Sequence, residues 1–345
     1  MNFTAANGSF ATPFPTFVKD CESIHPTAKN LAFAIVLTVI CVFTFVGNAC
    51  VILTVACHRS LHSVSYVLLV SLALADLFVS MFSMPWRIHA TIHNTLWCLD
   101  LPTCAFWIWT DSFACCASIT NLSAVGIERF VAIKAPLRYN TIMNKKTGSI
   151  MVAFVWSYAL IWASLGNLNW SNPDQEVFDI KISCAKRDTI YYTVVAVFAF
   201  YVPLAVVIVS YTYLTRVAII HVTALQEFMT PQRRPRGCSF QSERTIRLIK
   251  EIKATKMMVI VVGVFFISWF PFFVMVLKNL WSPAPTDPLL AELTSVVFVF
   301  ILPNLNSALN PIIYMTFTRE LRYAFYGFFK KIRQQKRNEN SSFTS

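Results

Sequence analysis

Residues 104–137 read CAFWIWTDSFACCASITNLSAVGIERFVAIKAPL. The apolar run that begins this stretch spans about a bilayer's thickness, is interrupted only by Asp111, and ends at Glu128-Arg129-Phe130. As a helix it would place Asp111 and Arg129 roughly 27 Å apart along the axis, near opposite faces of a membrane. An ionisable residue inside a spanning helix is costly and marks a functional site by default. The alternative is a structural aspartate paired with a neighbouring cation.

The whole chain has the composition of a membrane protein. Its 345 residues are 56% hydrophobic and 13% charged, whereas soluble domains carry about 25% charged residues. Seven nearly uncharged stretches reach the roughly 18 residues that a spanning helix needs. They lie near 31–57, 64–86, 101–127, 148–168, 189–214, 257–277 and 293–318. We therefore predict an all-α membrane protein, a seven-transmembrane helix bundle with a short amphipathic eighth helix.

The distribution of basic residues predicts the orientation. Of 29 Lys and Arg residues, 22 lie on the carboxyl-terminal side of the bundle and seven on the amino-terminal side. The positive-inside rule then puts the amino terminus outside and the carboxyl terminus in the cytoplasm, for a multi-pass plasma-membrane protein. The basic excess indicates contact with membrane lipid or acidic partners, and not with nucleic acid.

The chain divides into four parts. In order, they are an extracellular glycosylated tail at 1–30, the bundle at 31–317, an amphipathic membrane-surface helix at 318–333, and a cytoplasmic tail at 334–345. Glycosylation is expected at Asn2, Asn7 and Asn169, which begin acceptor motifs. The third cytoplasmic loop, at about 217–250, is expected to be flexible and basic.

Cysteines divide by compartment. Five of the ten lie in helices and are expected to be small buried hydrophobes, namely Cys41, Cys50, Cys57, Cys115 and Cys116. Four others lie on the outer side, where disulfides persist, namely Cys21, Cys98, Cys104 and Cys184. Four cysteines allow three pairings.

Further motifs stand one per helix. In order, they are Gly47-Asn48, Leu72-Ala73-Leu74-Ala75-Asp76, Glu128-Arg129-Phe130, Trp156, Pro203 with Tyr211, Phe265 with Trp269-Phe270-Pro271, and Asn310-Pro311 with Tyr314. Over about residues 30–335 this order resembles the rhodopsin-like (class A) G-protein-coupled receptors, and is closest to a divergent biogenic-amine receptor. The resemblance implies a receptor and not an enzyme. A transporter or channel is disfavoured, because the chain shows neither an internal repeat nor a polar face repeated along several helices.

The resemblance implies a disulfide and an ion site. Cys104 and Cys184 would pair and hold the second outer loop over the pocket, which leaves Cys21 and Cys98 either as a second bridge or as two free thiols. An internal sodium ion would be held by Asp76, Ser118, Asn306, Ser307 and Asn310. Oxygen-bearing side chains are the ligands that hard cations prefer, and a carboxylate this deep needs a cation or a proton.

The same resemblance implies a switch at the cytoplasmic face. At rest, Arg129 would pair with Glu128 and with Glu251 on the sixth helix; on activation it would turn toward Tyr211 and a heterotrimeric G-protein, with Tyr314 helping. A packing relay beneath the ligand would consist of Ile119, Pro203 and Phe265. Phe130 replaces the tyrosine usual in this family, which removes one hydroxyl.

Asp111 lies where amine receptors of this family hold a protonated amine. A small amine is therefore the expected ligand, since a carboxylate in a low-dielectric pocket binds a cation strongly. The expected ligand-binding residues are Asp111, Ser112, Cys115, Trp269, Phe272, Phe273 and Asn304. The alternative ligand is a peptide that presents a basic residue to Asp111.

Other positions set this chain apart from typical amine receptors. Val195, Ala196 and Ala199 stand where catecholamine receptors usually carry serines. Ile301 and Asn304 replace the aromatic pair that normally closes the amine site. Asn304 also excludes an opsin, which needs a Schiff-base lysine at that position.

Arg87 allows two interpretations. It lies two residues beyond Pro85 near the outer end of the second helix, on a face that meets the pocket in related receptors. The sequence favours a side chain that snorkels outward to headgroups and water. In the alternative interpretation, Arg87 pairs with Asp111 and takes the place of the ligand's amine.

Overall fold

A computed structural model describes most of the chain. The described residues are 25–94, 96–135, 137–170, 177–178, 180, 183–186, 188–229, 239–282, 294, 296–327, 330 and 334, with the backbone alone at 214, 218–229 and 239–258. Within them, seven helices are long and apolar enough to cross a membrane. The spans are Ala28–Cys57, Val64–Ile92, Leu101–Lys134, Lys145–Leu165, Thr189–Val217, Val259–Trp281 and Val296–Phe317. The predicted seven-helix fold is confirmed.

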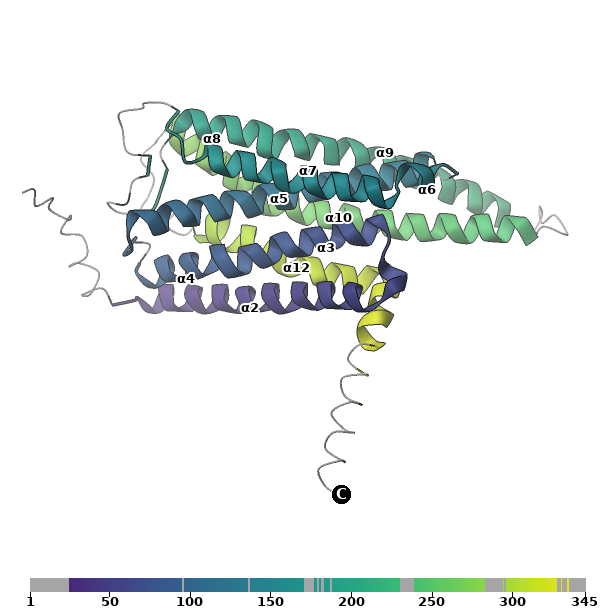
Figure 1. Cartoon of the computed structure of the whole chain (residues 1–345), viewed down its shortest axis with the longest axis horizontal. Coiled ribbons are helices and arrows are strands. Elements are labelled where there is room, and N and C mark those ends of the chain that lie inside the picture. The colour runs from purple at the N-terminus through teal and green to yellow at the C-terminus, as the bar shows by residue number, and fades with distance from the viewer. Residues whose placement is uncertain are drawn as a thin grey trace, which may run out of the picture.

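The helices run side by side along the long axis of the molecule (Figure 1). In chain order the elements are α2 (Ala28–Cys57), η1 (Arg59–Leu61), α3 (Val64–Phe78), η2 (Val79–Ser83), α4 (Met84–Ile92), α5 (Leu101–Lys134), α6 (Tyr139–Ile142), α7 (Lys145–Leu165), α8 (Thr189–Val195), η3 (Ala196–Tyr201), α9 (Val202–Met229), α10 (Ser239–Trp281), η5 (Val296–Ile301) and α12 (Leu302–Phe317). We call the end of the bundle where α5 begins the Cys104 end, and the opposite end the Arg129 end.

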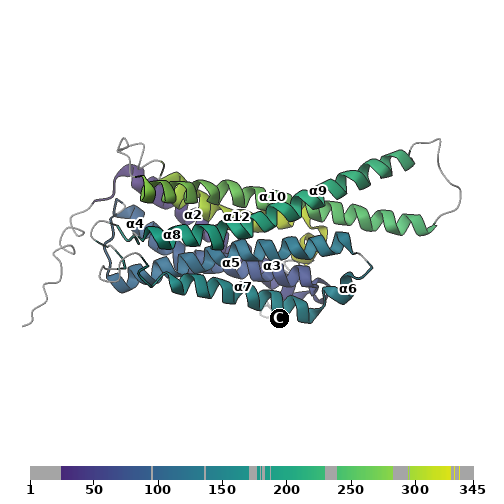
Figure 2. The ribbon, with the colours of Figure 1, turned by 90° about the horizontal axis from the view of Figure 1, so that it is seen from above.

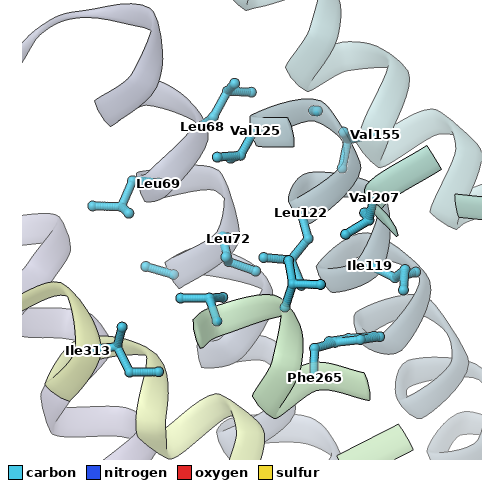
Figure 3. Packing of buried hydrophobic residues seen from close by; sticks show 14 of the residues in the cluster. Leu68, Leu69, Leu72, Ile119, Leu122, Val125, Val155, Val207, Phe265 and Ile313 are labelled. Atoms are coloured by element: carbon cyan, nitrogen blue, oxygen red, sulfur yellow. The ribbon is translucent and has the colours of Figure 1, made fainter. Parts of the chain in front are cut away.

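The core is apolar and centred on α5. Figure 3 shows Ile119, Leu122 and Val125 of α5 among apolar side chains from α3, α7, α9, α10 and α12. Ile119 is fully buried, whereas Phe43 and Val209 on outward faces are 63% and 70% exposed. A helix that is apolar on all sides is expected where its outer face meets lipid.

Two of the one-per-helix motifs tie neighbouring helices together. Asn48 Nδ2 on α2 donates to the carbonyl of Ser307 on α12 at 3.1 Å. The neighbouring Gly47 permits this approach, because an added Cβ would lie 2.9 Å from Cγ of Pro311. On the other side of the bundle, Trp156 Nε1 of α7 donates to Ser71 Oγ of α3 at 3.0 Å.

Two predicted boundaries need correction. Helix α9 continues to Met229, and helix α10 already begins at Ser239. Most of the expected flexible loop at 217–250 is therefore helical. Both helices extend past their neighbours at the Arg129 end (Figures 1 and 2). Neither 217–229 nor 239–250 contains a proline or a glycine, so no residue in them stops a helix. Residues 230–238 lie outside the described part. After α12, residues 319–327 are helical, which supports the predicted eighth helix.

Within the described residues, three short π-helical segments share one relation to proline. They are η2, η3 and η5, which end at Ser83, Tyr201 and Ile301, each two residues before a proline, at Pro85, Pro203 and Pro303. Proline cannot donate to the carbonyl four residues earlier, and its ring crowds that carbonyl, so the helix widens locally. The widening changes the direction in which the following side chains point. This geometry places Ser83, Arg87 and the Val299 carbonyl in the site described next.

Candidate functional site: a cavity closed by an internal ion pair

A cavity of about 830 Å³ opens at the Cys104 end of the bundle. Most of the predicted ligand-binding residues line it, namely Asp111, Ser112, Cys115, Trp269, Phe272 and Phe273. Cys184 lies in the same lining and is bonded to Cys104, with an S–S distance of 1.97 Å. The predicted disulfide is therefore confirmed, and it holds the segment before α8 beside the cavity.

The carboxylate of Asp111 is paired with a cation of the protein itself. Arg87 Nη2 lies 2.6 Å from Asp111 Oδ2, and the two side chains are 3% and 24% exposed. Ser83 Oγ donates to the second carboxylate oxygen, Oδ1, at 2.5 Å. The favoured expectation that Arg87 snorkels outward was wrong, because the side chain is buried and points into the bundle. An internal cation occupies the position expected for a ligand's amine.

Arg87 is held by more than its charge partner. Its Nη1 donates to the carbonyl of Val299 on η5 at 2.9 Å, and its Nε donates to Ser83 Oγ at 3.4 Å. In a regular helix the Val299 carbonyl would accept from residue 303, but Pro303 has no N–H. The guanidinium therefore binds an oxygen that has lost its usual helical donor.

Two aromatic rings complete the surroundings of Arg87. The guanidinium carbon lies 5.7 Å from the ring centroids of both Trp107 and Phe300. At this distance each ring face attracts a cation. Sequence reasoning missed Ser83, Val299 and both rings, and the available signals were the spacing of Ser83 and Arg87 at i, i+4 and the proline four residues after Val299.

The floor of the cavity is aromatic. Trp269 and Phe272 of α10 meet edge to face with centroids 5.6 Å apart, and Phe273 stacks on Phe200 of η3 at 4.2 Å. Val195 and Ala199 also line the cavity. This region suits an apolar or aromatic group, and the two aliphatic side chains have no atom that can hydrogen-bond a catechol.

Asn304 does not line the cavity and is the one predicted ligand residue that the structure places elsewhere. Its side chain is buried, and Nδ2 donates to the carbonyl of Phe300 on its own helix at 2.5 Å. The preceding π-helical segment leaves carbonyls for this bond, so the amide is used within the helix.

Asp76 on α3 is fully buried among polar side chains. Asn310 Nδ2 donates to Asp76 Oδ2 at 2.8 Å. Asp76 Oδ1, Ser118 Oγ, Asn306 Oδ1 and Asn310 Oδ1 are buried and have no hydrogen-bond partner among the described residues. Ser307 is buried as well. Buried oxygens without donors, including one of a carboxylate, fit a small hard cation such as sodium.

At the Arg129 end, Glu128 is fully buried and is the centre of a polar network. Arg129 donates to Glu128 through Nε at 2.5 Å and Nη2 at 2.8 Å. Ser65 Oγ of α3 donates to Glu128 at 2.9 Å, and Tyr139 Oη of α6 donates to the same carboxylate oxygen, Oε1. Arg129 Nη2 also contacts Ser65 Oγ.

Tyr139 was not predicted as part of this network. Burial, together with the adjacent Glu128 carboxylate, raises the pKa of Tyr139 to about 12, so the phenol keeps the proton that it donates to Glu128. The available signal was a tyrosine in the short turn directly after α5.

Of the other residues predicted for the switch, two are buried tyrosines and one has a side chain outside the described part. Tyr211 and Tyr314 are buried, and neither hydroxyl has a hydrogen-bond partner among the described residues. The side chain of Glu251 lies outside the described part of the structure. The pairing of Arg129 with Glu128 is present, whereas the expected pairing with Glu251 stays a prediction.

The residues of the predicted packing relay lie between the cavity and the Glu128 network. Ile119 and Phe265 are buried in one apolar cluster (Figure 3). The ring of Phe265 stacks on Trp269 above it, with centroids 6.1 Å apart. The Pro203 carbonyl accepts from Ser123 Oγ at 3.1 Å. A continuous packed path therefore leads from the cavity floor toward the Arg129 end.

The predicted second disulfide and the glycosylation motifs fall partly outside the described residues. Cys98 is disulfide-bonded, so it is not a free thiol; Cys21 lies outside the described residues. Asn2 and Asn7 also lie outside them. Asn169 is partly exposed in the segment after α7.

Comparison with known proteins agrees with this architecture. Residues 47–314 match the family of 7 transmembrane receptors (rhodopsin family). The chain belongs to this rhodopsin family of seven-transmembrane receptors.

Its relatives include adrenergic receptors. An alpha-1A adrenergic receptor of Oryzias latipes is 32% identical over 323 residues, which cover 87% of this chain and 67% of that protein. The alpha-1A adrenergic receptor of Homo sapiens is 32% identical over 332 residues, covering 87% and 69%, and the human alpha-1D adrenergic receptor is 29% identical over 332 residues, covering 87% and 56%. All three are receptors and not enzymes.

Proposed function

We propose that this G-protein-coupled receptor is activated by a small ligand whose protonated amino group binds Asp111 in the cavity. The observation that carries the proposal is the ion pair of Asp111 with Arg87 inside that cavity. In this position the carboxylate already binds a cation, and its side chain is 24% exposed and lines the cavity. The names of the adrenergic relatives support an amine as the ligand's cationic group.

The size of the cavity favours a small molecule over the peptide alternative. Ligand pockets for small molecules have volumes of about 300–1,000 Å³, and this one measures about 830 Å³. Cys184, bonded to Cys104, lines the same cavity as Asp111.

Binding would be transmitted along α10 to a heterotrimeric G-protein. A ligand seated on Trp269 would move Phe265, which packs beside Ile119 and the buried Tyr211 in the same cluster. A shift of α10 would then let Arg129 leave Glu128 and turn toward Tyr211. Interdigitated cores switch between discrete arrangements and do not deform continuously.

Sodium would bind at Asp76 and stabilise the resting arrangement. The unpartnered oxygens of Asp76, Ser118, Asn306 and Asn310 support this site, with Ser307 beside them. A cation there also offsets the charge of a carboxylate that is fully buried.

The proposed orientation puts the Cys104 end outside and the Arg129 end in the cytoplasm. The bias of Lys and Arg toward the second end supports it. At that end, residues 319–327 bury Leu321 and leave Tyr323 and Tyr326 71% and 65% exposed. Exposed aromatic rings on a basic helix suit contact with membrane lipid.

A second-messenger assay in cells tests the proposal with a panel of biogenic amines. At least one amine is expected to raise signalling in the wild type. Asp111→Asn should raise the amine concentration that gives half-maximal signalling about 10- to 100-fold, because a hydrogen bond to a charged group contributes about 1.5–3 kcal/mol. Arg129→Ala should remove signalling at unchanged surface expression. An amine response that is undiminished in Asp111→Asn would contradict the proposed site.

A further inference from the structure

The cavity has three charged side chains among its described lining residues, and two of them are cations. They are Arg87, Asp111 and Lys186. Lys186 Nζ donates to the carbonyl of Leu168 at 2.5 Å, lies 3.8 Å from Asp188 Oδ2 and stands over the ring of Tyr191 at 4.7 Å. Lys186 is therefore bound to other groups of the protein at the side of the cavity. The charged groups that remain for a ligand are Arg87 and Asp111.

A ligand with a single positive charge fits this arrangement poorly. To bind Asp111 it must either take the place of Arg87 Nη2, which lies 2.6 Å from the carboxylate, or share the carboxylate with Arg87 and leave an excess positive charge in the cavity. Arg87 is 3% exposed, and the described lining holds no second carboxylate that could receive it. Breaking a buried ion pair from one side leaves an uncompensated charge, which is strongly unfavourable.

We propose that the receptor's ligand is a zwitterion of the amino-acid type, in which an ammonium and a carboxylate lie close together. The ammonium binds Asp111, and the carboxylate binds Arg87. Each member of the opened pair then receives a new partner of opposite charge, and the net charge of the cavity does not change. Arginine suits this role because its planar group binds a carboxylate through two parallel hydrogen bonds.

The remainder of the ligand is an apolar ring. Below the pair, the cavity is bounded by Trp269, Phe272 and Phe273, with Val195 and Ala199 on the wall. Aromatic rings pack edge to face or offset against such a surface. This inference rests on the proposed function, since it assumes that Asp111 binds the amino group, and it adds Arg87 as a second residue that determines specificity.

Ligands that share one ring and differ only in charge provide the test. L-phenylalanine, phenethylamine and 3-phenylpropanoate form one series, and L-tryptophan, tryptamine and indole-3-propanoate form another. Binding is measured as ligand-induced thermal stabilisation of the purified full-length receptor in lipid nanodiscs, with each ligand up to millimolar concentration. In at least one series, the zwitterion is expected to bind wild type at least about tenfold more tightly than its amine and its acid.

Variants assign the preference to Arg87. In Arg87→Met the order of affinities should reverse, with the amine binding more tightly than the zwitterion, because the ligand's carboxylate has lost Arg87 as its partner. In the matched control Lys186→Met, which also removes a cation from the lining, the zwitterion should remain preferred. If Arg87→Met does not fold, the order of the three ligands in wild type still decides the question.

Two kinds of result would overturn the inference. If wild type binds the amine at least as tightly as the zwitterion in both series, or binds neither zwitterion, the ligand is not of this class. An order that is unchanged in Arg87→Met would do the same. Amine binding that is lost in Asp111→Asn would meanwhile leave the proposed function intact, whereas ligand binding that is unaffected by Asp111→Asn would overturn both.

Discussion

Arg87 and Asp111 form an ion pair, with 2.6 Å between Nη2 and Oδ2, in the lining of the cavity at the Cys104 end. The arginine comes from α4, the aspartate from α5, and the Val299 carbonyl of η5 holds the guanidinium from a third side. An exposed ion pair contributes little to stability, but removing one partner of a buried pair is costly. Asp111 thus has a built-in counterion in Arg87, which a ligand's amino group would meet under the proposed function.

The first prediction concerns thermal stability. Asp111→Ala should lower the free energy of unfolding by about 3 kcal/mol, the low end for breaking a buried pair, because it leaves the Arg87 charge without a carboxylate. Arg87→Met combined with Asp111→Ala should recover most of this loss, since no unpaired charge remains. The readout is the thermal midpoint in detergent without ligand. Equal midpoints for the single and the double variant would show that the pair is not a buried structural unit.

Sequence reasoning located Asp111 correctly but favoured the wrong position for Arg87. A charged residue near the end of a spanning helix most often reaches outward to headgroups and water, and the expectation for Arg87 rested on that tendency. The π-helical segment η2, placed two residues before Pro85, changes the direction of the residues that follow it. A local change of helix type depends on how proline crowds its neighbours in the folded bundle, and this dependence is not visible in apolar periodicity.

The second prediction concerns sodium. If Asp76 and its oxygen neighbours bind the ion, NaCl should raise the thermal midpoint of wild type above that in KCl at equal ionic strength, because a ligand that binds only the folded state stabilises it. Asp76→Asn should remove the difference between the two salts. The same difference in wild type and Asp76→Asn would indicate that Asp76 does not hold sodium.

The third prediction concerns the network at the Arg129 end. Tyr139→Phe removes one donor to Glu128 and should weaken the resting arrangement by about 1 kcal/mol, which raises basal nucleotide exchange on the G-protein about fivefold. Tyr66→Phe is the matched control, because its hydroxyl donates to Glu320 at the same end and not to Glu128. The pKa of Tyr139, about 12, means that this donor is present at any physiological pH.

Basal exchange is measured in membranes with equal amounts of receptor and purified G-protein. If Tyr139→Phe and Tyr66→Phe raise basal exchange equally, the bond to Glu128 has no special role in the resting state.

The chemistry of individual residues explains what the sequence could predict. The seven spans follow from length and apolarity, and the disulfide of Cys104 and Cys184 followed from the resemblance to the family. Asn304 was misplaced because an amide can hydrogen-bond a ligand or its own helix equally well, and the choice depends on the carbonyl of Phe300. Contacts between side chains from different helices, such as Ser65 and Tyr139 with Glu128, require the three-dimensional packing.

The most direct test of the competition between Arg87 and a ligand's amino group is a double-mutant cycle on amine binding. Phenethylamine affinity would be measured for wild type, Arg87→Met, Asp111→Asn and the double variant. Arg87→Met should tighten binding about tenfold when Asp111 is present, and should have no effect in the Asp111→Asn background. The same change in both backgrounds would show that Arg87 acts independently of Asp111, and would contradict the role of the pair as an internal counterion that the ligand displaces.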